Sequence, residues 1–269
     1  MRFYWYGKEE SPKQHDRNWG DICTPYILEP LLGYHPLRSH RNATGKLLTV
    51  GSIMHRLRGQ DVVWGAGIIS PTHFPNPIPP GVVFHAVRGP LTRKVLKTAG
   101  ADVPVVYGDP ALFISHLVPR AEQKVTHELG VIPHYNDMEG VVAHVGGRAD
   151  IKVINICGGF QEVIDQVCSC ERILSSTLHG LILGDCYAKQ AAWWRINGGS
   201  KLVGRDFKFK DYLLGTNRSP TSTDTFGSVP ERADIEWLPP PDIDLGKLFD
   251  ACPCNETGID ISAFQGGSS

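Results

Sequence analysis

Residues 82–107 read VVFHAVRGPLTRKVLKTAGADVPVVY, and their pattern decides the fold. The run from Val82 to Val87 is apolar and rich in valine, which is typical of a buried parallel strand. A helix is predicted next, because Pro90 suits its first residue and Gly100 suits the position after its end. Val103 to Tyr107 is predicted to be the following strand. The stretch is therefore expected to form one strand–helix–strand unit of a parallel sheet.

The same alternation continues on both sides of this unit. Further strands are predicted at residues 47–51, 62–64, 129–132, 152–156 and 172–174. Helical spacing of apolar residues follows Phe160, and another helix is expected to open at Ser175 or Ser176. Polar residues at 115–128 separate the two alternating parts. We expect an α/β protein with two Rossmann-like, doubly wound halves, residues 1–118 and 119–265, and a ligand cleft between them at the carboxyl ends of the strands.

Composition excludes several classes of partner and site. The 269 residues include 27 Lys+Arg and 28 Asp+Glu without runs of like charge, so no nucleic-acid partner is expected. The charge-free stretch 62–87 contains too many prolines for a transmembrane helix. Seven cysteines without a signal sequence predict reduced thiols, hence a cytoplasmic protein, in solution or at the inner face of the membrane. The one-residue spacing of the cysteine pairs 168/170 and 252/254 does not suit zinc, so no metal is expected.

Two candidate anion sites follow predicted strands of the first half. Gly65-Ala66-Gly67 lets backbone amides approach an anionic group, but it lacks the third small residue of a dinucleotide fingerprint. Arg88 ends a strand directly before a helix, where its guanidinium and the positive helix end both suit a phosphate or carboxylate. The alternative for Arg88 is an ordinary ion pair on the surface. Asp109 is either a turn residue or the partner that positions Arg88.

Two further candidates are an unusual histidine and a turn motif. His179, in Ser175-Ser176-Thr177-Leu178-His179-Gly180, falls in the first turn of an apolar helix, where the helix dipole disfavours an imidazolium. A bound anion would reverse that preference, and a buried hydrogen-bonded histidine is the alternative. Asn18-Trp19-Gly20-Asp21 precedes a short helical run and is also compatible with simple turn and capping chemistry.

Six segments in sequence order resemble the polysaccharide pyruvyl transferase family, particularly its exopolysaccharide-ketal branch. They are residues 18–21, 87–92, 107–111, 132–135, 175–180 and 207–212. The resemblance implies an enzyme with two Rossmann-like halves similar to the glycosyltransferase-B architecture. It implies transfer of the pyruvyl group of phosphoenolpyruvate, a co-substrate, onto a saccharide as a ketal in exopolysaccharide or cell-surface glycan synthesis, with no further cofactor. The acceptor is a saccharide, either free or lipid-linked.

The resemblance also implies roles for individual residues. His179 and Arg88 are the expected catalytic residues: His179 would bind the donor or act as the acid, and Arg88 would bind a donor anion and stabilise its loss. The donor-binding set is Arg88, Ser175, Ser176, Leu178, His179 and Gly67, and the set for acceptor binding or base catalysis is Asn18, Asp21 and His134.

The chain departs from the family pattern at one position. Many members carry arginine where this chain has Thr177, so one anionic group of the donor lacks an assigned cation. The candidates to replace it are Arg195, Arg205, Lys208 and Arg93. A nucleotide-sugar glycosyltransferase and a non-catalytic saccharide-binding relative are the alternative functions.

Overall fold

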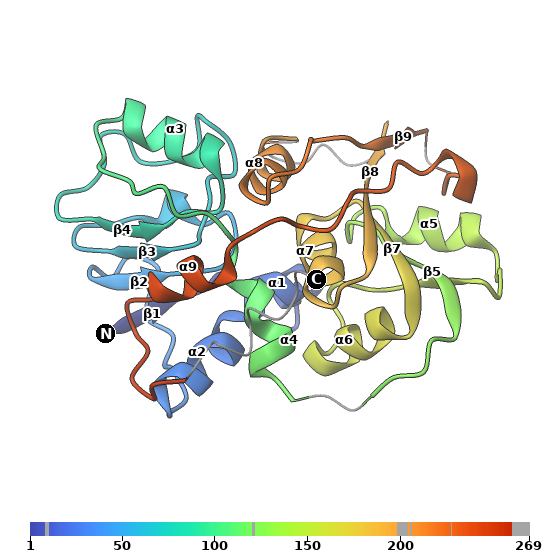
Figure 1. The fold of residues 1–269 in the computed structure, drawn as a ribbon, viewed down its shortest axis with the longest axis horizontal. Coiled ribbons are helices and arrows are strands. Elements are labelled where there is room, and N and C mark those ends of the chain that lie inside the picture. Colours follow the sequence, from blue (N-terminus) through green and yellow to red (C-terminus); the bar gives the residue numbers. More distant parts are fainter. Residues whose placement is uncertain (9–10, 120–121, 198–203, 205, 227, 260–269) are drawn as a thin grey trace.

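Two parallel sheets organise the chain (Figure 1). The computed structural model describes residues 1–269 apart from 9–10, 120–121, 198–203, 205, 227 and 260–269. The first sheet has the order β1-β2-β3-β4, formed by Arg2–Tyr4, Lys46–Leu48, Val62–Trp64 and Val83–Ala86. The second has the order β6-β5-β7-β8-β9, and in chain order its strands are β5 (His127–Ile132), β6 (Ile151–Val153), β7 (Cys170–Ser175), β8 (Gln190–Ile196) and β9 (Thr223–Thr225). All pairings are parallel, which confirms the predicted α/β class.

Helices connect the strands within each sheet and join the two sheets. The helices around the first sheet and at the junction are α1 (Trp19–Ile22), α2 (Thr24–Leu32), α3 (Pro90–Thr98) and α4 (Ile114–Leu117). Those that follow along the chain are α5 (Met138–Val145), α6 (Phe160–Cys168), α7 (Leu178–Cys186), α8 (Phe207–Gly215) and α9 (Leu245–Asp250). Short 3-10 turns are η1 (Gln14–Arg17), η2 (Met54–Arg56), η3 (Pro110–Phe113) and η4 (Arg232–Asp234).

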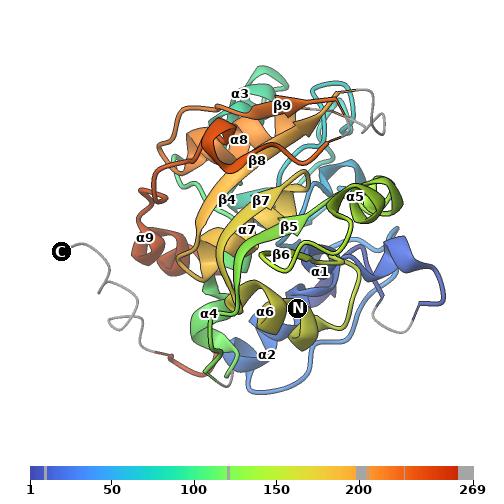
Figure 2. The ribbon, with the colours of Figure 1, turned by 90° about the vertical axis from the view of Figure 1, so that its right-hand side faces the viewer.

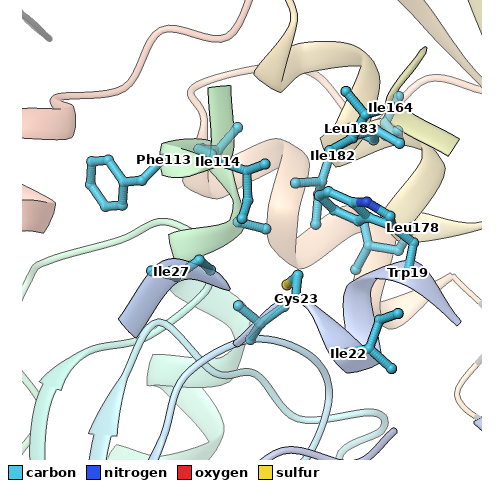
Figure 3. Packing of buried hydrophobic residues seen from close by; sticks show 14 of the residues in the cluster. Trp19, Ile22, Cys23, Ile27, Phe113, Ile114, Ile164, Leu178, Ile182 and Leu183 are labelled. Atoms are coloured by element: carbon cyan, nitrogen blue, oxygen red, sulfur yellow. The ribbon is translucent and has the colours of Figure 1, made fainter. Parts of the chain in front are cut away.

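The largest buried cluster is shared by the two halves. Figure 3 shows side chains of α1 and α2 facing those of α7, with Trp19 next to Leu178. The Trp19 ring also stacks on Phe160 of α6, with ring centroids 5.4 Å apart. After the second sheet the chain returns to the first, where the Trp64 Nε1 donates a hydrogen bond of 2.8 Å to the Leu248 carbonyl of α9. This shared core fixes the ends of the two sheets relative to each other.

Two local predictions are wrong. Residues 103–107 do not form a strand, and only Tyr107 makes an isolated bridge, to Val87. Pro104 lacks the N–H that a ladder needs, which explains why this valine-rich run does not pair. The helix predicted to open at Ser175 or Ser176 begins at Leu178, because β7 continues through Ser175 and Thr177 caps the helix by accepting a hydrogen bond of 3.2 Å from the Gly180 N–H.

The predicted boundary between the halves, after residue 118, falls between the end of α4 and the start of β5. Whether the halves are separate domains, and whether they follow the glycosyltransferase-B arrangement, both stay predictions. No helix among the described residues is long and apolar enough to span a membrane.

Candidate active site

His179 lies where the two halves meet, and the Asn18-Trp19-Gly20-Asp21 motif holds it. The His179 Nδ1 is 2.6 Å from the Asn18 Oδ1, which also accepts a hydrogen bond of 3.2 Å from the Gly20 N–H. Because this amide oxygen is an acceptor, the Nδ1 must carry the proton. The lone pair of the neutral ring is then on Nε2.

Two glycines leave room for this imidazole. A methyl group at Gly20 would lie 2.1 Å from the His179 Cγ, so the ring packs directly against the Gly20 backbone. A methyl group at Gly51 would lie 4.0 Å from the His179 Nε2 and 3.6 Å from the Asp21 Oδ1. Gly51 also has a φ of +97°, in the region that favours glycine. The imidazole and the carboxyl group therefore face the same space above Gly51, just beyond β2.

The environment shifts the pKa values of Asp21 and His179 in opposite directions. Burial raises the pKa of Asp21 to about 7, with the positive charge of Lys208 opposing the rise and Asp16 adding to it. Burial lowers the pKa of His179 to about 3, and the charges of Lys208 and Arg88 lower it further. At neutral pH an appreciable fraction of Asp21 thus retains its proton while His179 is a neutral base. Such oppositely shifted pairs are common where a site needs both an acid and a base.

Arg88 is fully buried at the end of β4, and its guanidinium is bonded to protein groups. The Nε donates to the Asp211 Oδ2 at 3.1 Å, the Nη1 to the Ser52 Oγ at 2.6 Å and the Nη2 to the Ile68 carbonyl at 2.8 Å. The Nη2 also forms an ion pair of 3.0 Å with Asp211. Asp211 additionally accepts hydrogen bonds from the backbone N–H and the hydroxyl of Thr92 at the start of α3.

Arg88 thus fastens α8 to α3, and Figures 1 and 2 show these two helices side by side. Asp211, not Asp109, is the carboxylate that pairs with Arg88. Asp109 instead caps η3, accepting a hydrogen bond of 3.1 Å from the Ala111 N–H. A role for Arg88 as a donor ligand stays a prediction.

The remaining residues of the predicted donor set line the junction in different ways. Ser175 is fully buried, and its hydroxyl accepts a hydrogen bond of 3.1 Å from the Thr177 N–H. The Ser176 Oγ accepts one of 2.8 Å from the His134 N–H. Leu178 is 3% exposed and packs in the shared core. Gly67 lies against Arg88, since a methyl group there would be 2.3 Å from the Arg88 Cζ.

His134 and Lys208 complete the cluster. His134 follows β5 and stacks on Tyr135 with ring centroids 4.1 Å apart. Its Nδ1 accepts a hydrogen bond of 3.3 Å from the Asn136 N–H, so the proton of the neutral ring is on Nε2. Burial lowers the pKa of His134 to about 4, and the charge of Lys208 lowers it further. The structure therefore brings together His179, Asn18 and Asp21, with His134 and Lys208 within electrostatic range.

A groove of about 1250 Å³ opens in the first half, next to this cluster. Its lining includes Tyr4, Trp5, Tyr6, Tyr26, Arg38 and Arg56. It also reaches Ile22, the neighbour of Asp21 on α1. In the described part of the chain, no group of three or more His, Cys, Asp or Glu side chains is arranged to hold a metal ion.

Comparison with known proteins identifies the family of the chain. The pattern of the polysaccharide pyruvyl transferase family matches residues 52–193, more than half of the chain. The chain belongs to this family. The matched segment includes Arg88, His134 and His179. It begins at Ser52, the residue after Gly51. An uncharacterised protein of Acanthamoeba polyphaga mimivirus is 30% identical over 169 residues, covering 61% of this chain and 58% of that protein, so the chain spans less than two thirds of this relative. No solved structure matches the chain significantly.

The sequence did not indicate two residues that shape this candidate site, Asp211 and Gly51. Asp211 was present in one of the six family-like segments, but nothing in its spacing indicates that it pairs with an arginine 123 positions earlier. Gly51 ends a predicted strand, and a glycine at that position is a signal that the chain turns sharply there.

Proposed function

We propose that the protein transfers the pyruvyl group of phosphoenolpyruvate to two hydroxyl groups of a saccharide, forming a pyruvate ketal. The observation that carries the proposal is the pair formed by Asp21 and His179 above Gly51, in a chain that belongs to the pyruvyl transferase family. The reaction needs a proton donor for the terminal carbon of the enol phosphate and an acceptor for hydroxyl protons. Two adjacent groups with oppositely shifted pKa values supply both.

We assign the acid role to Asp21 and the base role to His179. The sequence predicted His179 as the acid, but the hydrogen bond to Asn18 places the proton of the neutral ring on Nδ1 and supports Nε2 as a proton acceptor. His134 is a weaker candidate for the base, because the nitrogen with a lone pair already accepts from a backbone N–H.

The proton movements balance over one turnover. Asp21 protonates the methylene carbon of the donor, and the first saccharide hydroxyl adds to the neighbouring carbon as its proton passes to the His179 Nε2. The bond from that carbon to the phosphate oxygen then breaks, and the phosphate takes the proton from His179. The second hydroxyl adds to the same carbon and returns a proton to Asp21. The products are the ketal and inorganic phosphate, and both side chains recover their starting state.

We place the acceptor in the groove of the first half. Aromatic rings and hydrogen-bonding side chains together are typical of surfaces that bind sugars, and Tyr6 is 39% exposed beside the groove. Ile22, the neighbour of Asp21 on α1, is part of the groove lining, so we propose that a bound acceptor extends from the groove toward Asp21. Glycan synthesis as the biological setting, and a lipid-linked form of the acceptor, are parts of the same proposal.

The decisive experiment is product analysis with the purified protein. Candidate saccharides are incubated with phosphoenolpyruvate, and mass spectrometry follows the gain of one pyruvyl unit while a phosphate assay follows the released anion. We expect both signals to appear together and to disappear without either substrate. Stabilisation against heat by nucleotide sugars but not by phosphoenolpyruvate would instead indicate a glycosyltransferase. Binding of phosphoenolpyruvate with no turnover on any saccharide would indicate a non-catalytic relative.

A further inference from the structure

The donor carries two anionic groups, a phosphate and a carboxylate, and the site must hold at least one of them with a cation. The resemblance to the family implies an arginine in many members at the position of Thr177. The Thr177 hydroxyl accepts the Gly180 N–H as the cap of α7, so this residue supplies no positive charge. The missing charge must come from elsewhere in the chain.

Two of the four candidate cations, Arg195 and Arg93, are bonded to other protein groups. Arg195 pairs with Asp206 at 2.8 Å and also with Asp224. The Arg93 Nε donates a hydrogen bond of 2.9 Å to the Val103 carbonyl. Arg205 lies outside the described residues. The guanidinium of Arg88 is already bonded to Asp211, Ser52 and Ile68.

Lys208 differs from these residues in its surroundings. It is half-buried in the first turn of α8, three residues before Asp211, so the two side chains share a face of the helix. The bond between Asp211 and Arg88 turns this face toward the junction of the two halves. Within the described residues Lys208 makes no hydrogen bond or ion pair, and its ammonium lies 5.6 Å from the centroid of the Phe209 ring.

The charge of Lys208 reaches each titratable group of the candidate active site. It acts on Asp21 from α1, on His134 after β5 and on His179 of α7, and Arg88 acts on Lys208 in turn. The ammonium of Lys208 is therefore within electrostatic range of groups from both halves. Removing an ammonium from water without an anionic partner is unfavourable, and a bound anion would supply that partner.

We propose that Lys208 is the cation that binds an anionic group of the donor, in place of the arginine that many family members have at the position of Thr177. The inference rests on the proposed function, because it assumes phosphoenolpyruvate as the donor. Burial and the nearby charge of Arg88 lower the pKa of Lys208 to about 8, against the attraction of Asp21, so the side chain is still mainly charged at neutral pH and gains a strong partner when the anion binds. Arg88 then acts as the residue that positions α8, and Lys208 as the one that contacts the ligand.

The test compares two lysines of the same helix. Lys208→Ala and Lys208→Gln remove the proposed ligand, Lys208→Arg keeps the charge, and Lys210→Ala removes an exposed lysine that is 3.8 Å from Asp206. The measurements are the dissociation constants for phosphoenolpyruvate and inorganic phosphate by calorimetry, and KM and kcat for pyruvyl transfer. Far-ultraviolet circular dichroism and thermal unfolding without ligand check that each variant is folded.

We expect both neutral variants at Lys208 to weaken donor binding by about ten- to a hundredfold, the loss typical of a hydrogen bond to a charged group. Lys208→Arg should recover part of the affinity, and Lys210→Ala should bind as the unaltered protein does. Equal donor affinity in Lys208→Gln and the unaltered protein would overturn the inference while leaving the function intact. If the unaltered protein itself does not bind phosphoenolpyruvate, the proposed function fails instead. The two failures are therefore distinguishable.

Discussion

Arg88 and Lys208 are two cations at the same junction, and their surroundings are opposite. Arg88 is fully buried, and its three nitrogens all bond to protein groups, with Asp211 as the paired anion. Lys208 is half-buried and has no ion-pair partner in the described part of the structure. The carboxyl group of Asp21 likewise has no ion-pair partner among these residues.

This difference distinguishes charges that stabilise the fold from charges that are available to bind a ligand. A buried ion pair that satisfies its own hydrogen bonds has little left for a ligand, and its removal mainly affects folding. Charges that remain unpaired at a junction shift the pKa values of their neighbours and are available to substrates. Substitutions of Arg88 or Asp211 should therefore mainly change stability. Substitutions of His179, Asp21 or Lys208 should instead mainly change catalysis or ligand binding.

The largest effect is expected for His179→Gln. Glutamine keeps a polar side chain of similar size but removes the base at Nε2, so the rate of pyruvyl transfer should fall by about a hundredfold or more. Thermal stability should change little, since the substitution removes no ion pair. His144→Gln, at an exposed position on α5, is the matched control and should transfer at the normal rate. A His179→Gln variant that keeps more than about a tenth of the rate would show that this residue is not the base.

Asp211→Ala tests the structural side of the comparison. Removing one partner of a buried ion pair leaves the Arg88 charge uncompensated, and the free energy of unfolding should fall by about 3–5 kcal/mol. Urea denaturation measures this loss. Asp150→Ala breaks the exposed ion pair between Asp150 and Arg148, which are 2.8 Å apart, and should leave the free energy of unfolding almost unchanged. A small loss for Asp211→Ala, together with weaker donor binding, would instead place Arg88 among the donor ligands.

The sequence predicted β2 to β7, because each contains a short apolar run close to a turn residue, but it did not predict β1, β8 or β9. Val62–Trp64 matches the observed β3, and Val82–Val87 contains β4. The approach of His179 to Asn18, 161 positions apart, could be suspected only from the family resemblance. The pairing of Arg88 with Asp211 was not predictable, and neither was the lack of an ion-pair partner of Lys208 among the described residues. Both depend on how α8 packs against α3, and the apolar spacing within one helix does not indicate that packing.

Gly51→Ala adds a methyl group to the space that Asp21 and His179 face. The φ of +97° at Gly51 makes alanine strained, so we expect a loss of stability of about 1 kcal/mol or more. The added methyl group should also slow pyruvyl transfer by obstructing the donor. Gly100→Ala separates the two effects, because Gly100 has a φ of +84° with no atom within 4 Å of the added carbon. If both variants lose stability and transfer to the same degree, the space above Gly51 is not where the donor reacts.

Asp21→Asn should change stability by an amount that depends on pH. In the unfolded chain the carboxyl group titrates near its ordinary pKa of about 3.9, whereas in the folded protein burial raises the pKa to about 7. Between these values the folded state holds the proton more tightly, so the contribution of Asp21 to stability is full below pH 4 and is lost as the pH rises to 7. Asparagine has no such loss. Thermal unfolding from pH 4 to 8 should therefore show the variant gaining stability relative to the unaltered protein as the pH rises, with no further gain above pH 7. A constant difference across this range would mean that Asp21 has an ordinary pKa, and the acid role in transfer would have to move to another group.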